Sequence, residues 1–281
     1  MSDHAGVVCL IAAYEEEERI GRTVAAVLAS RVVDEVLVVD DGSSDGTAAE
    51  ARRAGAWVIR LERNAGKGQA LTAGARSLLA RPRRPDIVLL GDADLGDSAV
   101  HLSRLAGPIS GGRADVTVAR LPRQPGASGF GIVVRLARFG LRRLTGTAPA
   151  QPLSGQRAIR GDVLPWLLPF AGGFGVEVGM TIAAEEAGLR TADVLLDLFH
   201  APTGRDLGGL AHRGAQARDV AAALAVAAAR RWHPLRRRPA RPRPTRLHNA
   251  SGAPLEGRAA DARRAGTRYP VVPPPESPPP V

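Results

Sequence analysis

Three short apolar runs, each ending abruptly in polar side chains, constrain the fold of this chain more than any other feature. The runs cover residues 7–13, 35–41 and 87–94, and the first two lead into helical stretches that end near residues 30 and 54. Short strands that alternate with helices indicate a parallel, doubly wound sheet. The strand ends of such a sheet meet at one edge, where open α/β folds bind their ligands. We therefore expect an α/β fold with a ligand site at that edge.

Two carboxylates, Asp92 and Asp94, end the third run, and only Ala93 separates them. Carboxylate oxygens are hard ligands that suit Mg²⁺ or Mn²⁺ held jointly with the phosphates of a substrate. Aspartates also follow strands for a simpler reason, because they cap the next helix or stabilise a turn. The second run ends in a similar pair, Asp40 and Asp41, and this repetition favours a shared site.

Four motifs, standing in order, resemble the signatures of family 2-type GT-A glycosyltransferases. They are Ala-Ala-Tyr-Glu-Glu at 12–16, Asp-Asp-Gly-Ser-Ser-Asp-Gly-Thr at 40–47, Asn-Ala-Gly-Lys-Gly at 64–68 and Asp-Ala-Asp at 92–94. The match covers most of residues 7–120, and Ala12 stands where the family often has proline. The resemblance implies a GT-A fold, which is a Rossmann-like, mostly parallel sheet flanked by helices. It also implies a nucleotide-diphosphate sugar as donor, either a UDP- or a GDP-sugar, and Mg²⁺ or Mn²⁺ as cofactor.

The resemblance also implies roles for individual residues on the donor side. Tyr14, Glu16 and Asp41 would surround the nucleoside, Asp92 would lie near the ribose, and Asp94 would bind the metal and take part in catalysis. The full set of implied donor-binding residues is Ala12, Tyr14, Glu16, Asp41, Lys67, Asp92 and Ala93. A sugar that leaves a nucleotide diphosphate builds negative charge on the departing phosphate, which a divalent cation stabilises.

Lys67 is the only lysine of the chain, because the other 37 of its 38 basic residues are arginine. A compact ammonium between Gly66 and Gly68 suits close approach of the backbone to a phosphate. We therefore expect Lys67 to bind the donor diphosphate as a catalytic residue. The alternative is that this segment is only a loop before the helix expected at residues 69–79. The pattern is not a Walker loop, and no G-x-G-x-x-G follows the first strand, which disfavours a dinucleotide site.

The acceptor side is expected in the second half of the chain. Residues 152–160 are similar to the acceptor-proximal segment of polyprenyl-phosphate and phosphoglycerate glycosyltransferases. There Ser154, the N–H of Gly155 and the guanidinium of Arg157 would hold a phosphate. Residues 132–144 predict a helix with interspersed arginines. An ordinary amphipathic surface helix is the favoured interpretation, and a face for a membrane or an acceptor phosphate is the alternative.

Glu177 stands in Gly-Phe-Gly-Val-Glu-Val, at the start of a helix expected to run to about residue 188. The N-terminus of a helix stabilises a carboxylate, and this alone can explain the residue. The resemblance instead places Glu177 beside the donor sugar or the acceptor hydroxyl. It would act as a base in an inverting mechanism or orient the sugar in a retaining one, and the sequence leaves both open.

Two histidines are candidates for a further metal ligand. His200 follows the apolar run 194–199, so it would stand at a strand end. Residues 206–213 resemble the C-terminal segment of glucosyl-3-phosphoglycerate synthases, in which the histidine ligates the metal, and this match favours His212. The arginines expected to face substrate phosphates are Arg205 and Arg213.

The net charge of +10 is concentrated at the C-terminal end, where residues 230–281 hold 12 arginines against three acidic residues and 12 of the 22 prolines. We expect residues 1–230 to form the GT-A domain and residues 231–281 a disordered tail. A contact with an anionic membrane and a solvated tail without a partner both fit this composition. Specific binding of nucleic acid is not expected, since no aromatic residues alternate with the arginines.

These features predict a cytoplasmic, metal-dependent hexosyltransferase that uses a phosphate-bearing acceptor, such as polyprenyl phosphate. The single cysteine excludes a disulfide within the chain, and we expect neither a signal peptide nor a membrane span, since no apolar run reaches about 20 residues. A retaining enzyme similar to the glucosyl-3-phosphoglycerate synthases is the alternative, with a small phosphorylated acid as acceptor. A noncatalytic sugar-nucleotide-binding module is another alternative. A homodimer is compatible with each of these functions. A nucleotidyltransferase would need a glycine-rich loop after the first strand, where Tyr14 and four glutamates stand.

Overall fold

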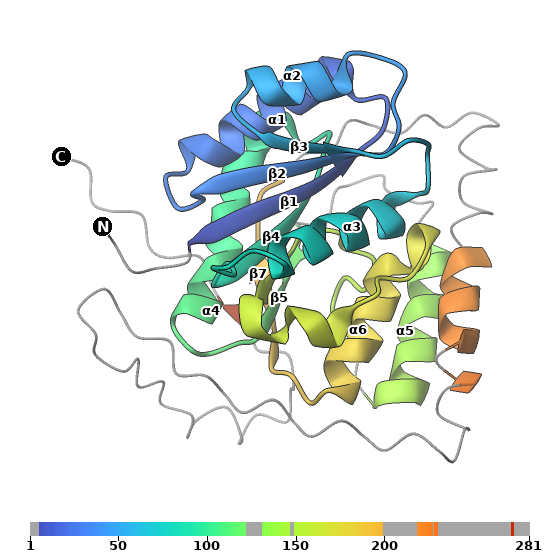
Figure 1. Ribbon diagram of the computed structural model, residues 1–281. Helices are drawn as coiled ribbons and strands as arrows, with labels where there is room; N and C mark the ends of the chain where they lie inside the picture. Colours follow the sequence, from blue (N-terminus) through green and yellow to red (C-terminus); the bar gives the residue numbers. More distant parts are fainter. Residues whose placement is uncertain are drawn as a thin grey trace.

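The computed structural model describes residues 6–121, 131–146, 149–198, 218–226, 228–229 and 271–272. One sheet in the order β3-β2-β1-β4-β6-β5-β7-β8 forms its centre (Figure 1). The strands are β1 (Val7–Ala13), β2 (Glu35–Asp40), β3 (Trp57–Arg60), β4 (Ile87–Asp92), β5 (Val116–Arg120), β6 (Arg157–Arg160), β7 (Thr191–Leu195) and β8 (Val271–Val272). The α-helices are α1 (Glu17–Ala29), α2 (Thr47–Arg53), α3 (Lys67–Leu79), α4 (Gly107–Ser110), α5 (Gly131–Thr145) and α6 (Val176–Glu186). The 3-10 helices within the described residues are η1 (Gly96–Ala106), η2 (Gly161–Leu167) and η3 (Gly173–Gly175).

The sheet is parallel except at β6, which runs antiparallel to both β4 and β5. In the register of the parallel strands, Ala13 pairs with Asp40 and Ala12 pairs with Asp92. The polar ends of β1, β2 and β4 therefore lie at one edge of the sheet. This arrangement confirms the predicted α/β fold with a mostly parallel sheet and a shared edge.

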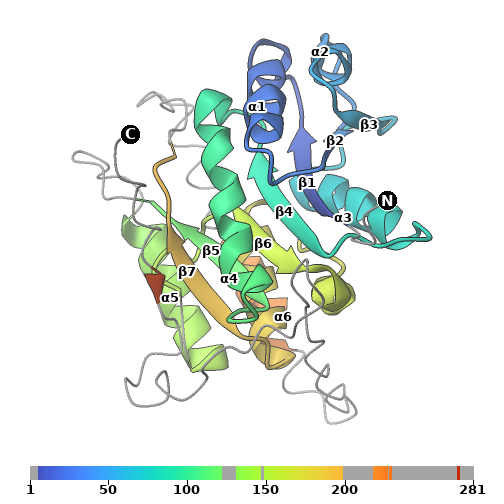
Figure 2. The same cartoon turned by 90° about the vertical axis from the view of Figure 1, so that its left-hand side faces the viewer.

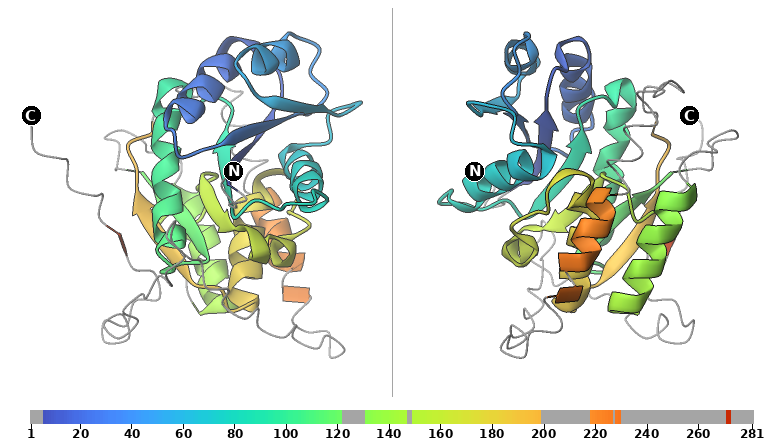
Figure 3. Two further views of the ribbon diagram at one scale, coloured as in Figure 1. Left: turned by 60° about the vertical axis from the view of Figure 1, so that its left-hand side comes forward. Right: turned by 90° about the vertical axis from the view of Figure 1, so that its right-hand side faces the viewer.

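Apolar side chains pack on both faces of the sheet, because successive residues of a strand point to opposite sides. In β1, Cys9 and Ile11 contact the core under α1 and η1, whereas Val8 and Leu10 contact the core under α3 and α6. Figure 2 shows α1 and α3 on opposite sides of β1. A third cluster joins α5, α6 and helical residues 218–226, which lie side by side in both panels of Figure 3. Within the described residues, no helix is long and apolar enough to cross a membrane.

The structure differs from the sequence expectations at the C-terminal side of the sheet. The strand expected at the apolar run 194–199 is present as β7, but it covers Thr191–Leu195, so it begins and ends earlier than expected. His200 lies outside the described residues, and its expected role as a metal ligand stays a prediction. Val271–Val272 pair with β7 although a disordered tail was predicted for residues 231–281. The rest of that tail lies outside the described part of the chain.

A buried ion-pair network holds the opposite edge of the sheet, at the start of β5 and the end of β6. The Asp115 carboxylate accepts hydrogen bonds from the Arg160 and Arg190 guanidinium groups, at 2.5 and 2.8 Å, and from the backbone N–H of Arg190. The side chains of Asp115 and Arg160 are only 8% and 4% exposed. Burial alone would raise the pKa of Asp115, but these arginines outweigh it and lower the pKa.

We expect Asp115→Ala to lower the free energy of unfolding by about 3–5 kcal/mol, because it leaves the Arg160 charge buried without this partner. Urea denaturation checks this value, with Asp97→Ala as control, since Asp97 forms an exposed ion pair with Arg22.

The lowered pKa of Asp115 also makes stability depend on pH. Ionised Asp115 stabilises the fold at every pH above its unfolded pKa of about 3.9, and this stabilisation is lost as the pH falls through its lower, folded pKa. The Asp115→Asn variant should therefore show a flatter acid dependence than the wild type. If the stability of Asp115→Asn fell with pH as steeply as that of the wild type, ionised Asp115 would not be the group that stabilises the fold.

Candidate active site

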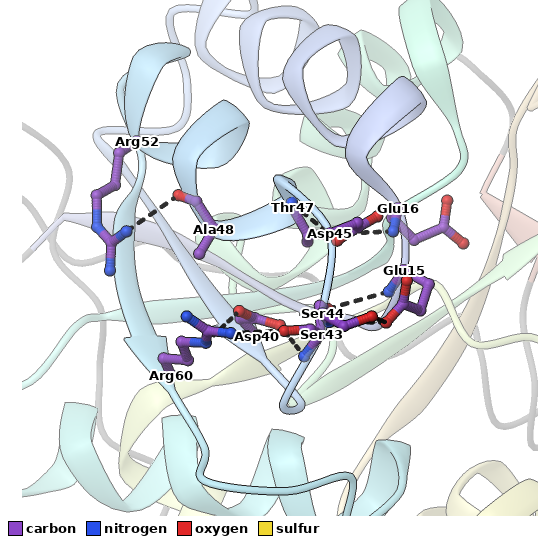
Figure 4. Close-up of polar contacts among 10 residues, drawn as sticks. All are labelled: Glu15, Glu16, Asp40, Ser43, Ser44, Asp45, Thr47, Ala48, Arg52 and Arg60. Carbon is purple, nitrogen blue, oxygen red and sulfur yellow. Dashed lines mark hydrogen bonds and ion pairs between the residues drawn. The ribbon is translucent and has the colours of Figure 1, made fainter.

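The loops that follow β1 and β2 are joined by hydrogen bonds between the first two sequence motifs (Figure 4). The backbone N–H of Glu15 donates to Ser43 Oγ at 3.0 Å, and the N–H of Glu16 donates to Thr47 Oγ1 at 2.8 Å. The Glu15 carboxylate in turn accepts from the N–H and the hydroxyl of Ser44. These small polar residues thus fix the loop geometry. Tyr14 remains 47% exposed on the same loop, with its ring accessible for stacking.

The carboxylate pair at the end of β2 fixes two further loops. Asp40 is fully buried, accepts a hydrogen bond from the N–H of Ser43 and pairs with Arg60 Nε at 3.3 Å. Asp41 accepts from the backbone N–H groups of Ala65 and Gly66, at 2.8 and 2.7 Å, one on each oxygen. Asp41 therefore orders the loop that leads into α3, a task that the sequence did not reveal. Its expected contact with the nucleoside stays a prediction.

Lys67 connects the end of β4 with the start of α6. Its ammonium donates to Asp92 Oδ1 at 2.8 Å and to Glu177 Oε1 at 3.1 Å. Burial would lower the pKa of Lys67, but the two carboxylates outweigh burial and raise it, so the side chain is a stable cation. The Lys67 side chain is still 36% exposed, which leaves part of it accessible to a ligand. We name Lys67, Asp92 and Glu177 the ammonium cluster.

Glycines permit the close packing around the ammonium cluster. Gly66 precedes α3 with a φ of +91°, a conformation that residues with a side chain rarely adopt. A Cβ on Gly68 would lie 1.9 Å from the carbonyl oxygen of Ala171, in the loop before α6. A Cβ on Gly155 would lie 2.9 Å from Lys67 Nζ and 3.1 Å from Asp92 Oδ1. The Asn-Ala-Gly-Lys-Gly motif thus needs its glycines to bring Lys67 to the strand end.

The segment before β6 completes the surroundings of Asp92. The Gln156 side-chain amide donates to Asp92 Oδ2 at 2.5 Å, so each oxygen of this carboxylate has a partner. Gln156 is only 2% exposed. Sequence reasoning missed this residue, although it stands between the two motif positions Gly155 and Arg157 that were singled out.

Asp94 and Glu16 lie close enough for their carboxylate charges to interact, and Glu16 also pairs with Arg19 Nε at 2.8 Å. Burial raises the pKa of Glu16, the neighbouring Arg19 opposes this, and the charge of Asp94 raises it further. The two carboxylates therefore repel each other, and a cation near them would relieve the repulsion. Within the described residues, His, Cys, Asp and Glu side chains form no group of three or more that could hold a metal ion. Such a partial ligand set fits Mg²⁺, which often takes one or two carboxylates and completes its shell with substrate phosphates and water.

The residues expected to bind an acceptor differ in accessibility. The Arg157 guanidinium is 1% exposed and donates to the carbonyls of Ser154 and Pro152 and to Thr181 Oγ1. In this structure the hydrogen bonds of the Arg157 guanidinium to Ser154, Pro152 and Thr181 stay inside the protein, and its expected contact with a phosphate stays a prediction. Ser154 is 8% exposed, and Glu177 is 6% exposed at the second position of α6, where the helix was expected to begin.

Other predicted site residues, namely Arg205, His212 and Arg213, lie outside the described residues. The chain re-enters the described part at helical residues 218–226. There a Cβ on Gly173 would lie 2.1 Å from Asp219 Oδ2, and a Cβ on Gly175 would lie 3.0 Å from Ala223 Cβ. This helix therefore packs on η3, directly before the helix that carries Glu177.

Ala12 and Ala93 border the site through their backbones. Ala12 lies opposite Asp92 in the sheet. The Ala93 side chain is 6% exposed and packs in the core under α1, and its expected role in donor binding stays a prediction.

Comparisons with known proteins agree with this arrangement. The chain is 34% identical over 198 residues to a glucosyl-3-phosphoglycerate synthase of Mycolicibacterium paratuberculosis, which covers 62% of this chain and 58% of the relative. It is 30% identical over 179 residues to glycosyltransferase AglJ of Haloferax volcanii, covering 61% of this chain and 56% of that relative. The chain thus spans somewhat more than half the length of these relatives.

Solved structures give a broader match. A glucosyl-3-phosphoglycerate synthase from Mycobacterium tuberculosis, in complex with Mn²⁺, UDP and glucosyl-3-phosphoglycerate, matches with a TM-score of 0.64 and 31% identity over 79% of each chain. The Mg²⁺ and UDP complex of that protein matches with a TM-score of 0.65 and 30% identity over 79% of each chain. A family model described as glycosyl transferase family 2 matches residues 8–168, which is more than half of the chain. The chain therefore belongs to glycosyl transferase family 2.

Proposed function

We propose that this glycosyltransferase moves a glucosyl group from UDP-glucose to a small phosphorylated acid of the phosphoglycerate type. The observation that carries the proposal is the ammonium cluster, in which Lys67 joins Asp92 on the donor side to Glu177 on the helix expected near the acceptor. The M. tuberculosis relative was solved in complex with Mn²⁺, UDP and glucosyl-3-phosphoglycerate, and its structure matches 79% of this chain. Polyprenyl phosphate is the second acceptor to be tested.

Lys67 is proposed to meet the negative charge that develops on the leaving diphosphate. Its ammonium is held in place before substrate binds, so little reorganisation is needed when the sugar–phosphate bond breaks. The exposed part of the side chain gives a diphosphate oxygen access to the cation. Asp92 would remain beside Lys67 and orient the ribose of the donor.

Asp94 is proposed to hold a divalent cation, with Glu16 beside it and His212 as a further ligand. When bound, Mg²⁺ or Mn²⁺ would act as a Lewis acid on the diphosphate oxygens. The protein side chains supply hard oxygen donors and a neutral imidazole, which Mn²⁺ accepts readily. Arg205 and Arg213, from the same segment as His212, are proposed to bind substrate phosphates.

Glu177 is proposed to orient the donor sugar rather than to act as the base. Its Oε1 accepts a hydrogen bond from Lys67, and the carboxylate is nearly buried at the first turn of α6. A base for an inverting reaction must instead reach the acceptor hydroxyl directly. Ser154 and the N–H of Gly155 border the cluster, and we propose that they bind the acceptor phosphate.

The deciding experiment is a matrix of UDP- and GDP-sugars, with Mn²⁺ present, against 3-phosphoglycerate and against polyprenyl phosphate in detergent. Nucleotide release measures turnover, and mass spectrometry identifies the product. We expect UDP-glucose with 3-phosphoglycerate to give glucosyl-3-phosphoglycerate. Transfer only to polyprenyl phosphate would replace the proposed acceptor. Donor binding in a thermal-shift assay without any turnover would instead favour a noncatalytic sugar-nucleotide-binding module.

The basic tail is expected to be dispensable for the chemical step. Lys67, Asp92 and Glu177 all precede it, and its described strand β8 pairs with β7 at the side of the sheet away from β1 and β4. We expect truncation after Trp232 to leave hydrolysis of the donor in solution unchanged, as measured by nucleotide release at saturating Mn²⁺. A large loss would show that the tail contributes to the site. Contact of the tail with the anionic inner face of the membrane stays a prediction, which sedimentation with anionic vesicles tests. A homodimer also stays a prediction, which light scattering tests.

A further inference from the structure

Thr23 of α1 reaches the turn that carries both aspartates at the end of β4. Its Oγ1 donates a hydrogen bond to the carbonyl of Ala93 at 2.7 Å and accepts one from the backbone N–H of Gly96 at 2.9 Å. Thr23 is fully buried, so water does not compete for these bonds. One hydroxyl thus bridges both ends of the segment that contains Asp94.

The rest of the turn depends on the same contact. Ala93 and Leu95 are 6% and 3% exposed and pack in the core under α1, whereas Asp92 and Asp94 alternate with them and are partly exposed. Apolar packing therefore sets which side of the turn faces the site. It does not by itself fix the rotation of the peptide groups around Asp94. Gly96, with a φ of +53°, lets the chain turn into η1 at this point.

We infer that Thr23 is a positioning residue that fixes the Asp94 carboxylate for the divalent cation. The inference rests on the proposed function, in which Asp94 is the metal ligand. Thr23 contacts neither the donor nor the cation in this scheme and acts only through the peptide groups of Ala93 and Gly96. Removing an outer partner of a metal ligand typically weakens metal affinity about 10- to 100-fold.

The test measures binding of Mn²⁺ in the presence of UDP, followed by loss of the electron paramagnetic resonance signal of free Mn²⁺. We expect Thr23→Val, which keeps the shape but removes the hydroxyl, to bind Mn²⁺ about tenfold more weakly than the wild type. In turnover, the Mn²⁺ concentration for half-maximal rate should rise by the same factor, and kcat should recover at saturating Mn²⁺. The matched control is Thr117→Val, because Thr117 is equally buried and donates to the carbonyl of Leu105.

A second pair of variants decides the matter if Thr23→Val does not fold. Thr23→Ser and Thr23→Ala both lack the γ-methyl group and differ only in the hydroxyl. We expect the serine variant to bind Mn²⁺ like the wild type and the alanine variant to bind it about tenfold more weakly. Equal binding by the two variants would overturn the inference, as would an equal loss in Thr117→Val. Unchanged Mn²⁺ binding in Asp94→Asn would overturn the metal assignment itself, and the inference with it.

Discussion

Replacement of Asp94 by asparagine is expected to lower kcat/KM for sugar transfer by about 10³-fold. The cation that Asp94 is proposed to hold would supply several kcal/mol of charge stabilisation to the leaving diphosphate, and each 1.4 kcal/mol is about tenfold in rate. Asparagine keeps the size of the side chain but removes its charge, so the fold should persist. Calorimetry of UDP binding should show that the Mn²⁺-dependent gain in affinity is lost, whereas the weak binding without metal stays the same.

Asp97→Asn is the matched control for this experiment. Asp97 lies three residues further along the chain, at the start of η1, and its side chain is 77% exposed in an ion pair with Arg22. Its replacement removes the same charge from the same region and should change neither metal dependence nor rate. If Asp94→Asn kept the full effect of Mn²⁺ on UDP affinity, the metal would have to be bound elsewhere. Asp92, already paired with Lys67 and Gln156, would then need a new role.

The sequence predicted the strands that form the ligand edge, because each is a short continuous apolar run that ends in polar residues and leads into a helical segment. β1 was predicted with the bounds that the structure has, and β2 and α3 were within two residues. It missed β3 and the antiparallel β6. β6 is only four residues long and contains two buried arginines, so its composition carries no strand signal. The end of β7 was also missed, since apolar residues continue into the core beyond the last pair with β5.

The site was predictable in its residue types and less so in its contacts. The motifs pointed to Lys67, Asp92 and Glu177, but nothing in the sequence showed that one ammonium contacts both carboxylates. The contact between Lys67 and Glu177 joins positions that are 110 residues apart in the chain. The packing of α3 against the loop before α6 brings them together. Arg157 is a different case. The motif suggested a phosphate ligand, and the structure adds that the side chain is buried on β6 and supports the backbone carbonyl of Ser154, which the sequence did not indicate.

Lys67→Met is expected to lower kcat/KM by about 10²- to 10³-fold, as the loss of one preorganised donor does in comparable sites. Methionine fills a similar volume but leaves the Asp92 and Glu177 carboxylates near each other without the cation between them. Their repulsion should also weaken binding of the donor diphosphate, so KM for the donor should rise while kcat falls. Steady-state kinetics at saturating Mn²⁺ separates the two effects. The control is Arg76→Met, which removes a cation from the exposed side of the same helix.

Lys67→Arg tests whether charge alone is sufficient at this position. All other basic residues of the chain are arginine, yet the space at the ammonium cluster is closed by Gly155, whose added Cβ would lie only 2.9 Å from Lys67 Nζ. A planar guanidinium needs more room than an ammonium and holds carboxylates in a different geometry. We therefore expect Lys67→Arg to lose most of the activity that Lys67→Met loses, and Gly155→Ala to reduce it in the same direction by displacing the ammonium. Full activity in Lys67→Arg would show that this position requires only a positive charge, and the glycines around it would then need another explanation.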